Sequence, residues 1–221
     1  TANHLIECLK EYNAEKEVFS LLQMVAHTLE MRPLLRLKVK DDFVQEELTQ
    51  RFDQLLKEEP SEFDLDYDDF LKSIKTTLFF EDWINEKNED FLMEKFGIRP
   101  GEIRMKLESA DWLLYAASEL AKIEGYNELI KDIHKLRIRV KNGVKEELLP
   151  LLKLKGIGRM RARKMYMNGL KDLGDLKKID LVSLSQILGK AVSTSIKKQL
   201  GEDVVVVPAG KLKGQLSLEK F

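Results

Sequence analysis

The sequence predicts an all-α protein made of a helical bundle, a small helical module and a flexible C-terminal tail. Apolar side chains recur at helical spacing through most of the 221 residues, and only Asp203–Val207, which ends before Pro208, has the pattern of a strand. Glycine and proline separate the helical runs. We place the bundle at residues 1–142, the module at 143–207 and the tail at 208–221.

The helices of the bundle can be placed in order from the apolar runs and from the residues that end them. Pro33 and Pro60 stop two runs, Asn88 has the position of an N-cap, and Gly97 and Gly125 close two later helices. An aromatic stretch is expected to follow the fourth helix. We expect helices with approximately these bounds: His4–Glu11, Glu15–Leu29, Asp42–Leu56, Asp66–Leu78, Asn88–Gly97, Glu102–Ile123 and Asn127–Lys141.

The composition favours a soluble, folded protein, with 34% charged and 43% hydrophobic residues. No stretch approaches ~20 consecutive apolar residues, so we expect no membrane span. The first residues lack the basic start and apolar run of a signal peptide, and we expect a cytoplasmic protein. The single cysteine, Cys8, excludes an internal disulfide and is expected to be a core residue, not a nucleophile.

The net charge of −1 conceals a gradient along the chain. Residues 1–98 carry a net charge of −11, residues 99–145 carry +3, and residues 146–221 carry +7. An asymmetry of this size within one chain indicates that the C-terminal half faces a polyanion.

A glycine-linked pair of helices is the strongest motif of the basic module. An apolar segment runs into Gly156-Ile157-Gly158 and then directly into a helical segment with three arginines and a lysine. The glycines allow a sharp turn, and the new helix presents unpaired N–H groups that favour phosphate. This is the pattern of a DNA-binding helix-hairpin-helix. Pro150 predicts a kink or restart in its first helix.

The candidate DNA-binding residues of the module follow from this pattern. A second, degenerate copy of the hairpin is expected around Gly189, with lysines on its next helix. The alternative interpretation is a glycine-linked helix pair with a solvated basic face. The candidates are Gly156, Ile157, Gly158, Arg159, Arg161, Arg163, Lys164, Lys197 and Lys198.

Several catalytic and metal-binding patterns fail on inspection. Asp64-x-Asp66-x-Asp68 begins like an EF-hand loop, but Asp69 and Lys75 occupy the positions that need glycine and glutamate. The three histidines lie far apart without ligand spacing, so we expect no metal and no catalytic residue. No phosphate-binding loop of the Gly-x-x-x-x-Gly-Lys-Ser/Thr type occurs, so we expect no cofactor in this chain and no ATP hydrolysis by it alone.

Three blocks of the sequence, in order, resemble the C-terminal part of the archaeal Hjm helicase, a superfamily-2 DNA helicase. They are Phe96–Ile103, Ser109–Ala116 and Gly156–Tyr166. The resemblance covers essentially the whole chain. It implies a helical "ratchet" domain followed by a helix-hairpin-helix domain, with motor domains that use ATP and Mg²⁺ upstream. It also implies 3'-5' translocation, action at stalled forks and in recombinational repair, and binding of single-stranded or forked DNA.

The resemblance assigns roles to particular residues. In the family a long ratchet helix follows the translocating strand, and Trp112 matches its base-contacting aromatic position. Base stacking on an indole tolerates any sequence; the alternative is that Trp112 is a core residue. For the basic partner, Met105 has the expected register, and we choose its neighbour Arg104. The arginine-rich hairpin, with Arg161 and Arg163 at its centre, is implied to act as a brake on the motor.

The tail has the spacing of a sliding-clamp-binding peptide. Gln215, Leu218 and Phe221 follow the Gln-x-x-aliphatic-x-x-aromatic pattern, which puts the two apolar side chains on one face of a helical turn. The alternative is an unspecialised chain end. For the whole chain, the alternative to a helicase module is a non-enzymatic adaptor bundle that recruits repair or replication proteins.

Overall fold

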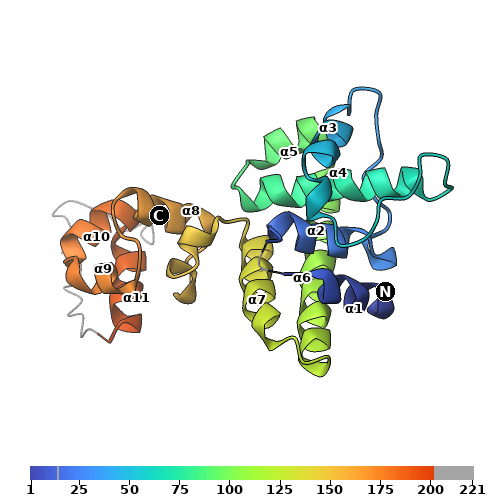
Figure 1. The fold of residues 1–221 in the computed structure, drawn as a ribbon. Coiled ribbons are helices and arrows are strands. Elements are labelled where there is room, and N and C mark those ends of the chain that lie inside the picture. Colours follow the sequence, from blue (N-terminus) through green and yellow to red (C-terminus); the bar gives the residue numbers. More distant parts are fainter. Residues whose placement is uncertain (14, 202–221) are drawn as a thin grey trace, which may run out of the picture. The chain divides into compact units, whose positions relative to one another are not determined.

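The computed structural model describes residues 1–13 and 15–201, and all regular elements in these ranges are helices (Figure 1). The predicted all-α class is confirmed for this part of the chain. The predicted strand at Asp203–Val207 and the tail with Gln215, Leu218 and Phe221 lie outside the described residues.

The chain divides into two compact units, residues 1–149 (unit 1) and the residues from Pro150 on (unit 2). The predicted boundary, after residue 142, was therefore seven residues too early. Residues 143–149 stay with unit 1 because polar contacts tie them to it: Lys135 Nζ lies 2.8 Å from Glu146 Oε1, and the Lys145 N–H donates to Glu86 Oε1 at 3.0 Å. The Arg139 guanidinium also donates to the Val144 carbonyl.

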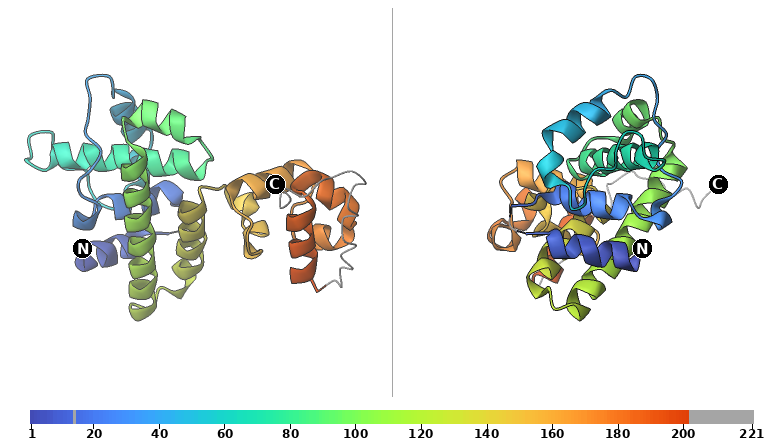
Figure 2. Two further views of the ribbon diagram at one scale, coloured as in Figure 1. Left: turned by 180° about the vertical axis from the view of Figure 1, so that it is seen from behind. Right: turned by 45° about the vertical axis from the view of Figure 1, so that its right-hand side comes forward.

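Unit 1 contains seven α-helices and three 3₁₀ turns among its described residues. Helices α6 and α7 pack side by side, as Figures 1 and 2 show. The helices are α1 (Ala2–Glu11), α2 (Val18–Ala26), α3 (Phe43–Gln50), α4 (Tyr67–Ile84), α5 (Glu89–Phe96), α6 (Pro100–Ile123) and α7 (Asn127–Asn142). The turns are η1 (Leu29–Met31), η2 (Phe52–Gln54) and η3 (Glu146–Leu148).

The core of unit 1 corrects three predicted helix bounds. Helix α4 continues six residues beyond the predicted end at Leu78, because Phe79 and Phe80 are fully buried and Phe79 packs edge-on against Phe96 at 5.8 Å. The predicted helix Glu15–Leu29 is shorter, with α2 buried from Phe19 to Ala26. The predicted helix Asp42–Leu56 splits into α3 and η2.

Two buried lysines hold the extended segment 32–41 against the bundle. The Lys75 ammonium on α4 donates to Asp41 Oδ2 at 2.6 Å and to the Arg36 carbonyl at 2.7 Å. The Lys106 ammonium on α6 donates to the Pro33 carbonyl at 2.6 Å and to the Met31 carbonyl at 3.2 Å. These bonds satisfy backbone acceptors that burial would otherwise leave unpaired, and they fix the path of the segment.

Unit 2 consists of short helices joined by tight turns. The interruption predicted at Pro150 is present: η3 and η4 (Leu151–Lys153) lie on either side of it, so the first limb of the hairpin is 3₁₀ rather than α-helical. The remaining helices are α8 (Arg159–Met167), α9 (Leu173–Lys178), α10 (Leu181–Leu188) and α11 (Lys190–Gln199). Asp172 and Asp180 cap α9 and α10 through their carboxylates.

Candidate nucleic-acid interface

Helix α6 presents an aromatic side chain to solvent near the middle of its length. Trp112 is 55% exposed, whereas its neighbours Leu113 and Leu114 are fully buried. The alternative interpretation of Trp112 as a core residue is therefore wrong. Tyr115 and Met105 are also about half exposed on the same helix. An accessible indole on a rigid helix can stack with a planar base.

Arg104 lies at the edge of the exposed face of α6, away from Trp112 and Met105. At about 100° per residue, it is rotated about 80° from Trp112, whereas Met105 is rotated only about 20°. The Arg104 side chain is 84% exposed, and its Nε lies 3.0 Å from Glu108 Oε1. It borders a groove that also contains three acids, Glu89, Glu108 and Asp111, and one lysine, Lys141. The surroundings of Arg104 are therefore acidic.

The glycine turn of unit 2 has the backbone that the sequence predicted. Gly156 has φ +80°, and Gly158 is the N-cap of α8 in an extended conformation. Ile157 between them is buried. The Arg161 guanidinium donates to the Gly156 carbonyl at 2.6 Å, which closes the turn from the helix side. Nothing lies within 4 Å of a Cβ placed at Gly156 or Gly158, so the turn is open to an approaching ligand.

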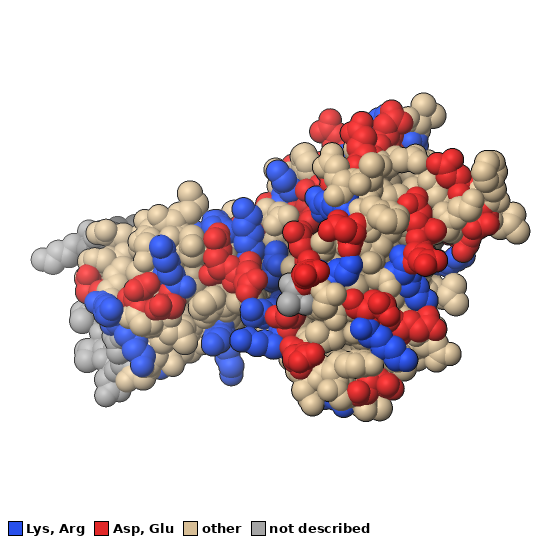
Figure 3. Space-filling view, in the orientation of Figure 1, with Lys and Arg blue, Asp and Glu red and all other residues tan. Residues whose placement is uncertain are grey.

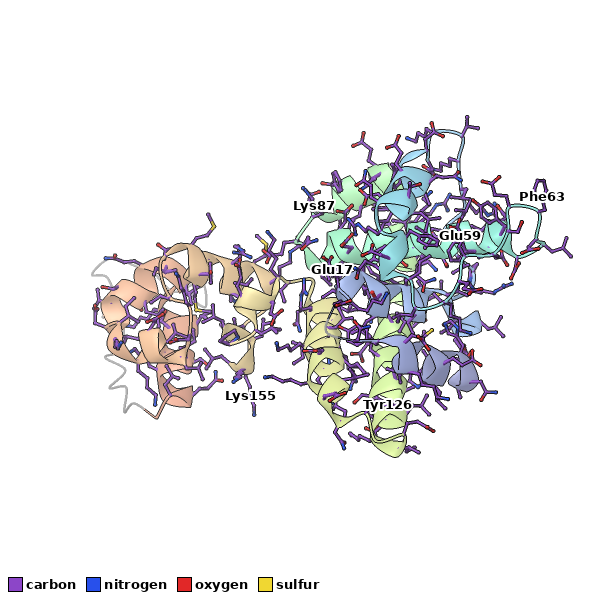
Figure 4. All side chains as sticks on the ribbon, viewed as in Figure 1. Glu17, Glu59, Phe63, Lys87, Tyr126 and Lys155 are labelled. Carbon is purple, nitrogen blue, oxygen red and sulfur yellow. The ribbon has the colours of Figure 1, made fainter. Side chains whose placement is uncertain are left out.

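A second contact anchors this turn to the last helix of unit 2. The Lys155 N–H donates to Gln199 Oε1 at 2.8 Å, and Gln199 Nε2 donates back to the Lys155 carbonyl at 3.2 Å. Figure 4 labels Lys155 at the edge of unit 2. The paired bonds hold the backbone of the turn in one conformation before any ligand binds.

The cations of α8 occupy more than one surface. Arg161 and Lys164 are exposed, whereas Arg159 and Arg163 are half-buried. The Arg163 guanidinium lies 5.3 Å from the centre of the Tyr166 ring, and Lys171 approaches the same ring at 5.7 Å. Two cations therefore lie against the Tyr166 ring beside the hairpin, and this arrangement concentrates positive charge there.

The second hairpin copy is present, but one of its two predicted DNA-binding lysines is buried. Gly189, with φ +85°, joins α10 to α11 as expected. Lys198 is exposed, but Lys197 is only 2% exposed and its ammonium donates to the Lys177 carbonyl at 3.2 Å. That carbonyl lies at the C-terminal end of α9, where the helix dipole favours a cation. Lys197 therefore supports the packing of unit 2 and lacks the exposed position that the predicted DNA contact requires.

Cys8 is buried in unit 1, and His134 makes a side-chain hydrogen bond there. Burial raises the pKa of the Cys8 thiol to about 12, which removes its nucleophilic form at neutral pH. His134 is hydrogen-bonded to Ser118 at 2.8 Å. Among residues 1–13 and 15–201, no three His, Cys, Asp or Glu side chains are placed to hold a metal ion. In the same ranges, no helix is long and apolar enough to cross a membrane.

One basic groove was missed by the sequence reasoning. It lies beside the start of α6 and is bordered by Arg36, Lys38 and Arg99. The net charge of −11 over residues 1–98 concealed it, and carboxylates crowd the face of unit 1 shown in Figure 3. The cluster of four cations among residues 32–40 was the one local signal that could have found it.

The chain is similar in sequence to a known protein family and to several named proteins. Residues 19–143 match the family described as archaeal helicase, domain 4. The chain is 34% identical to an ATP-dependent DNA helicase Hel308 of Pyrococcus horikoshii over 94% of its length, and 32% identical to that of Pyrococcus abyssi over 93%. The Hel308 helicase of Methanocaldococcus jannaschii is 34% identical over 91% of the chain.

The chain spans 29% of the length of each Pyrococcus relative and 16% of the M. jannaschii one. These relatives bear the name Hel308, so the expected resemblance to an archaeal DNA helicase is confirmed, while the narrower assignment to Hjm stays a prediction. The matched range contains α2 to α7 and Trp112. This chain belongs to the archaeal helicase domain 4 family.

Proposed function

We propose that this chain is the strand-gripping part of an ATP-dependent DNA helicase of the Hel308 type, acting in the cytoplasm on single-stranded or forked DNA. The half-exposed Trp112 on α6 carries the proposal, because it combines an accessible stacking surface with membership of a helicase domain family. Hydrolysis of ATP with Mg²⁺ is the work of motor domains outside this chain. The enzyme is proposed to move 3'-5' and to act at stalled forks and in recombinational repair.

The two units divide the grip between them. Trp112 stacks on bases, an interaction that is independent of sequence. The hairpin of unit 2 binds phosphates through the N-terminus of α8 and through Arg159, Arg161, Arg163 and Lys164, with Gly156, Ile157 and Gly158 forming the turn. Lys198 extends this surface from the second hairpin. Phosphate contacts hold the strand without reading it, which suits a restraint on the motor.

Replacement of Trp112 tests the stacking contact. Trp112→Ala should weaken binding of an oligo(dT) strand by about 1–3 kcal/mol per stacked base, which is about 5- to 150-fold for one base. Fluorescence anisotropy of a labelled strand measures the change. Ile123→Ala removes another exposed apolar side chain at the end of the same helix and should leave binding unchanged. Equal affinities of wild type and Trp112→Ala would contradict the stacking role.

Replacement of the hairpin arginines tests the phosphate contacts. The Arg161→Ala/Arg163→Ala double variant should reduce the slope of log affinity against log salt by up to about 1.4, since each single-strand phosphate contact contributes about 0.7. The Arg32→Ala/Lys122→Ala variant removes the same charge from ion-paired positions of unit 1 and serves as the control. A salt slope that is the same in wild type and hairpin variant would refute this assignment.

The C-terminal peptide is proposed to bind a sliding clamp through Gln215, Leu218 and Phe221. The proposal is supported by their spacing alone. Calorimetric titration of an archaeal clamp should show binding by the full chain and none by a chain without residues 215–221. Unchanged clamp binding after the deletion would show that these residues are not the contact.

A further inference from the structure

A groove of about 380 Å³ runs between the segment at residues 33–38 and the first turns of α6. Three cations, Arg36, Lys38 and Arg99, and one acid, Glu102, border it, and Met105 forms part of its wall. All three cations are exposed, although they come from two parts of the sequence about sixty residues apart. The groove is therefore assembled by the fold and not by a local motif.

The groove is built on fixed backbone. Lys75 and Lys106 hold its outer segment through the carbonyls of Arg36, Pro33 and Met31. Lys38 lies across Gly97, so closely that a Cβ at Gly97 would overlap the ammonium. Gly97 follows the C-terminus of α5, where carbonyl groups and the helix dipole attract a cation. The Lys38 charge is thus positioned before any ligand arrives.

These cations differ from other cations of unit 1 in their partners. Arg32, Arg51, Arg104 and Arg137 each form an ion pair with a carboxylate. Within residues 1–13 and 15–201, no carboxylate oxygen lies within 4.0 Å of the charged nitrogens of Arg36, Lys38 or Arg99. Glu102, the acid that borders the groove, accepts the Arg99 N–H at 2.9 Å and caps α6. Unpaired cations gathered in one hollow favour an anionic ligand.

The groove shares a face of α6 with Trp112. Met105 in its wall is seven residues before Trp112, so the two lie about 20° apart around the helix and about 10 Å apart along it. Arg104 faces the acidic groove on the other side. A strand whose base stacks on Trp112 can therefore continue along Met105 into the basic groove without crossing the helix.

We propose that Arg36, Lys38 and Arg99 bind the phosphates of the DNA strand that stacks on Trp112, and that they, in place of Arg104, are the basic partners of this tryptophan. The proposal rests on the proposed function of Trp112 and adds the phosphate site that the stacking site lacks. An acidic protein segment would be the other polyanion for such a groove, but the continuity with an exposed indole favours a nucleic acid.

The test is the salt dependence of single-strand binding by the full chain. The Arg36→Gln/Lys38→Gln/Arg99→Gln variant keeps side-chain length and removes three charges. Its slope of log affinity against log salt should be smaller by about 2 than that of wild type. Between 50 and 200 mM salt, wild type should accordingly lose about 15- to 20-fold more affinity than the variant. Circular dichroism and thermal unfolding establish that the variant is folded.

The matched control is Arg32→Gln/Lys72→Gln/Lys122→Gln, which removes three ion-paired cations from the same unit and should leave the slope unchanged. An unchanged slope in the groove variant, or an equal decrease in the control, would overturn the proposal. Trp112→Ala distinguishes failure of the groove site from failure of the proposed function. If Trp112→Ala weakens single-strand binding while the groove variant binds as wild type, the proposed function stands and the groove site does not. If Trp112→Ala has no effect, the proposed function itself fails.

Discussion

Units 1 and 2 are both helical, but they build their surfaces in different ways. In unit 2 the glycine turn of the hairpin is contiguous in sequence, and glycines with positive φ, such as Gly156 and Gly189, meet nothing within 4 Å of a Cβ. In unit 1, Gly97 and Gly143 also have positive φ, but side chains from distant segments lie against them. The glycines of unit 2 serve the backbone alone, whereas these two also make room for tertiary contacts.

The buried charged side chains of the two units also differ in whether their partners are distant side chains or backbone groups. Unit 1 encloses a complete ion pair, since the side chains of Lys75 and Asp41 are 0% and 1% exposed. In unit 2 the buried Lys197 ammonium rests on a backbone carbonyl at a helix end. The position of segment 32–41 in unit 1 therefore depends on long-range polar contacts. The turns of unit 2 depend on local conformation, and substitutions should affect the two units differently.

The largest expected effect is the loss of one partner of the buried pair. Lys75→Met leaves the Asp41 carboxylate buried without its cation and should lower the free energy of unfolding by about 3–5 kcal/mol. Lys122→Met breaks an exposed pair with Glu119 and should cost less than about 1 kcal/mol. Urea unfolding measures both. Similar losses in the two variants would show that the Lys75 pair does not organise unit 1.

A pair of glycine substitutions compares the turns of the two units. An L-residue with positive φ costs about 1–2 kcal/mol, and this cost applies to both Gly156→Ala and Gly143→Ala. Gly143→Ala should cost more, because its Cβ would approach the Trp83 ring to 2.7 Å and that indole is fixed by a hydrogen bond to the Val140 carbonyl. Differential scanning calorimetry of the two variants gives the ranking. A greater loss for Gly156→Ala would contradict the distinction.

The smallest expected effect is a pH dependence confined to unit 1. Burial and the nearby His4 ring lower the pKa of His27 from 6.5 to about 4. Between these values the unfolded chain binds a proton that the folded chain excludes, so stability falls as the pH decreases from about 6.5. At pH 6 the His27 contribution should be below about 1 kcal/mol. It is measured as the difference between wild type and His27→Gln, and a difference independent of pH would contradict it.

Local signals were sufficient to predict much of the fold. Asn88 caps α5 through its side chain, and Gly97 follows it in the left-handed conformation, as the residue types predicted. The end of α4 could not be predicted, because Phe79 and Phe80 remain helical through packing against distant residues. The unit boundary was misplaced for the same reason, since contacts with Lys135 and Glu86 hold residues 145 and 146 in unit 1.

The candidate site divides in the same way. The hairpin is contiguous, so its turn and the helix that carries its arginines could be predicted from the sequence, while their contact with DNA stays a prediction. The prediction for Lys197 was wrong, because its burial depends on where α9 ends in space. The basic groove joins Arg36 and Arg99, which no spacing rule connects. From the sequence, Arg104 was therefore predicted as the basic partner of Trp112. Sites formed by one turn can be read from sequence, whereas sites formed between segments need the fold.

The proposed grip of this chain on single-stranded DNA can be measured as its binding of oligo(dT) at two salt concentrations. Anisotropy titrations of the full chain at about 50 and 200 mM salt should give micromolar or tighter binding at low salt and a steep loss at high salt. Binding that is absent at low salt, or that is the same at both concentrations, would contradict the account and favour a bundle that recruits proteins.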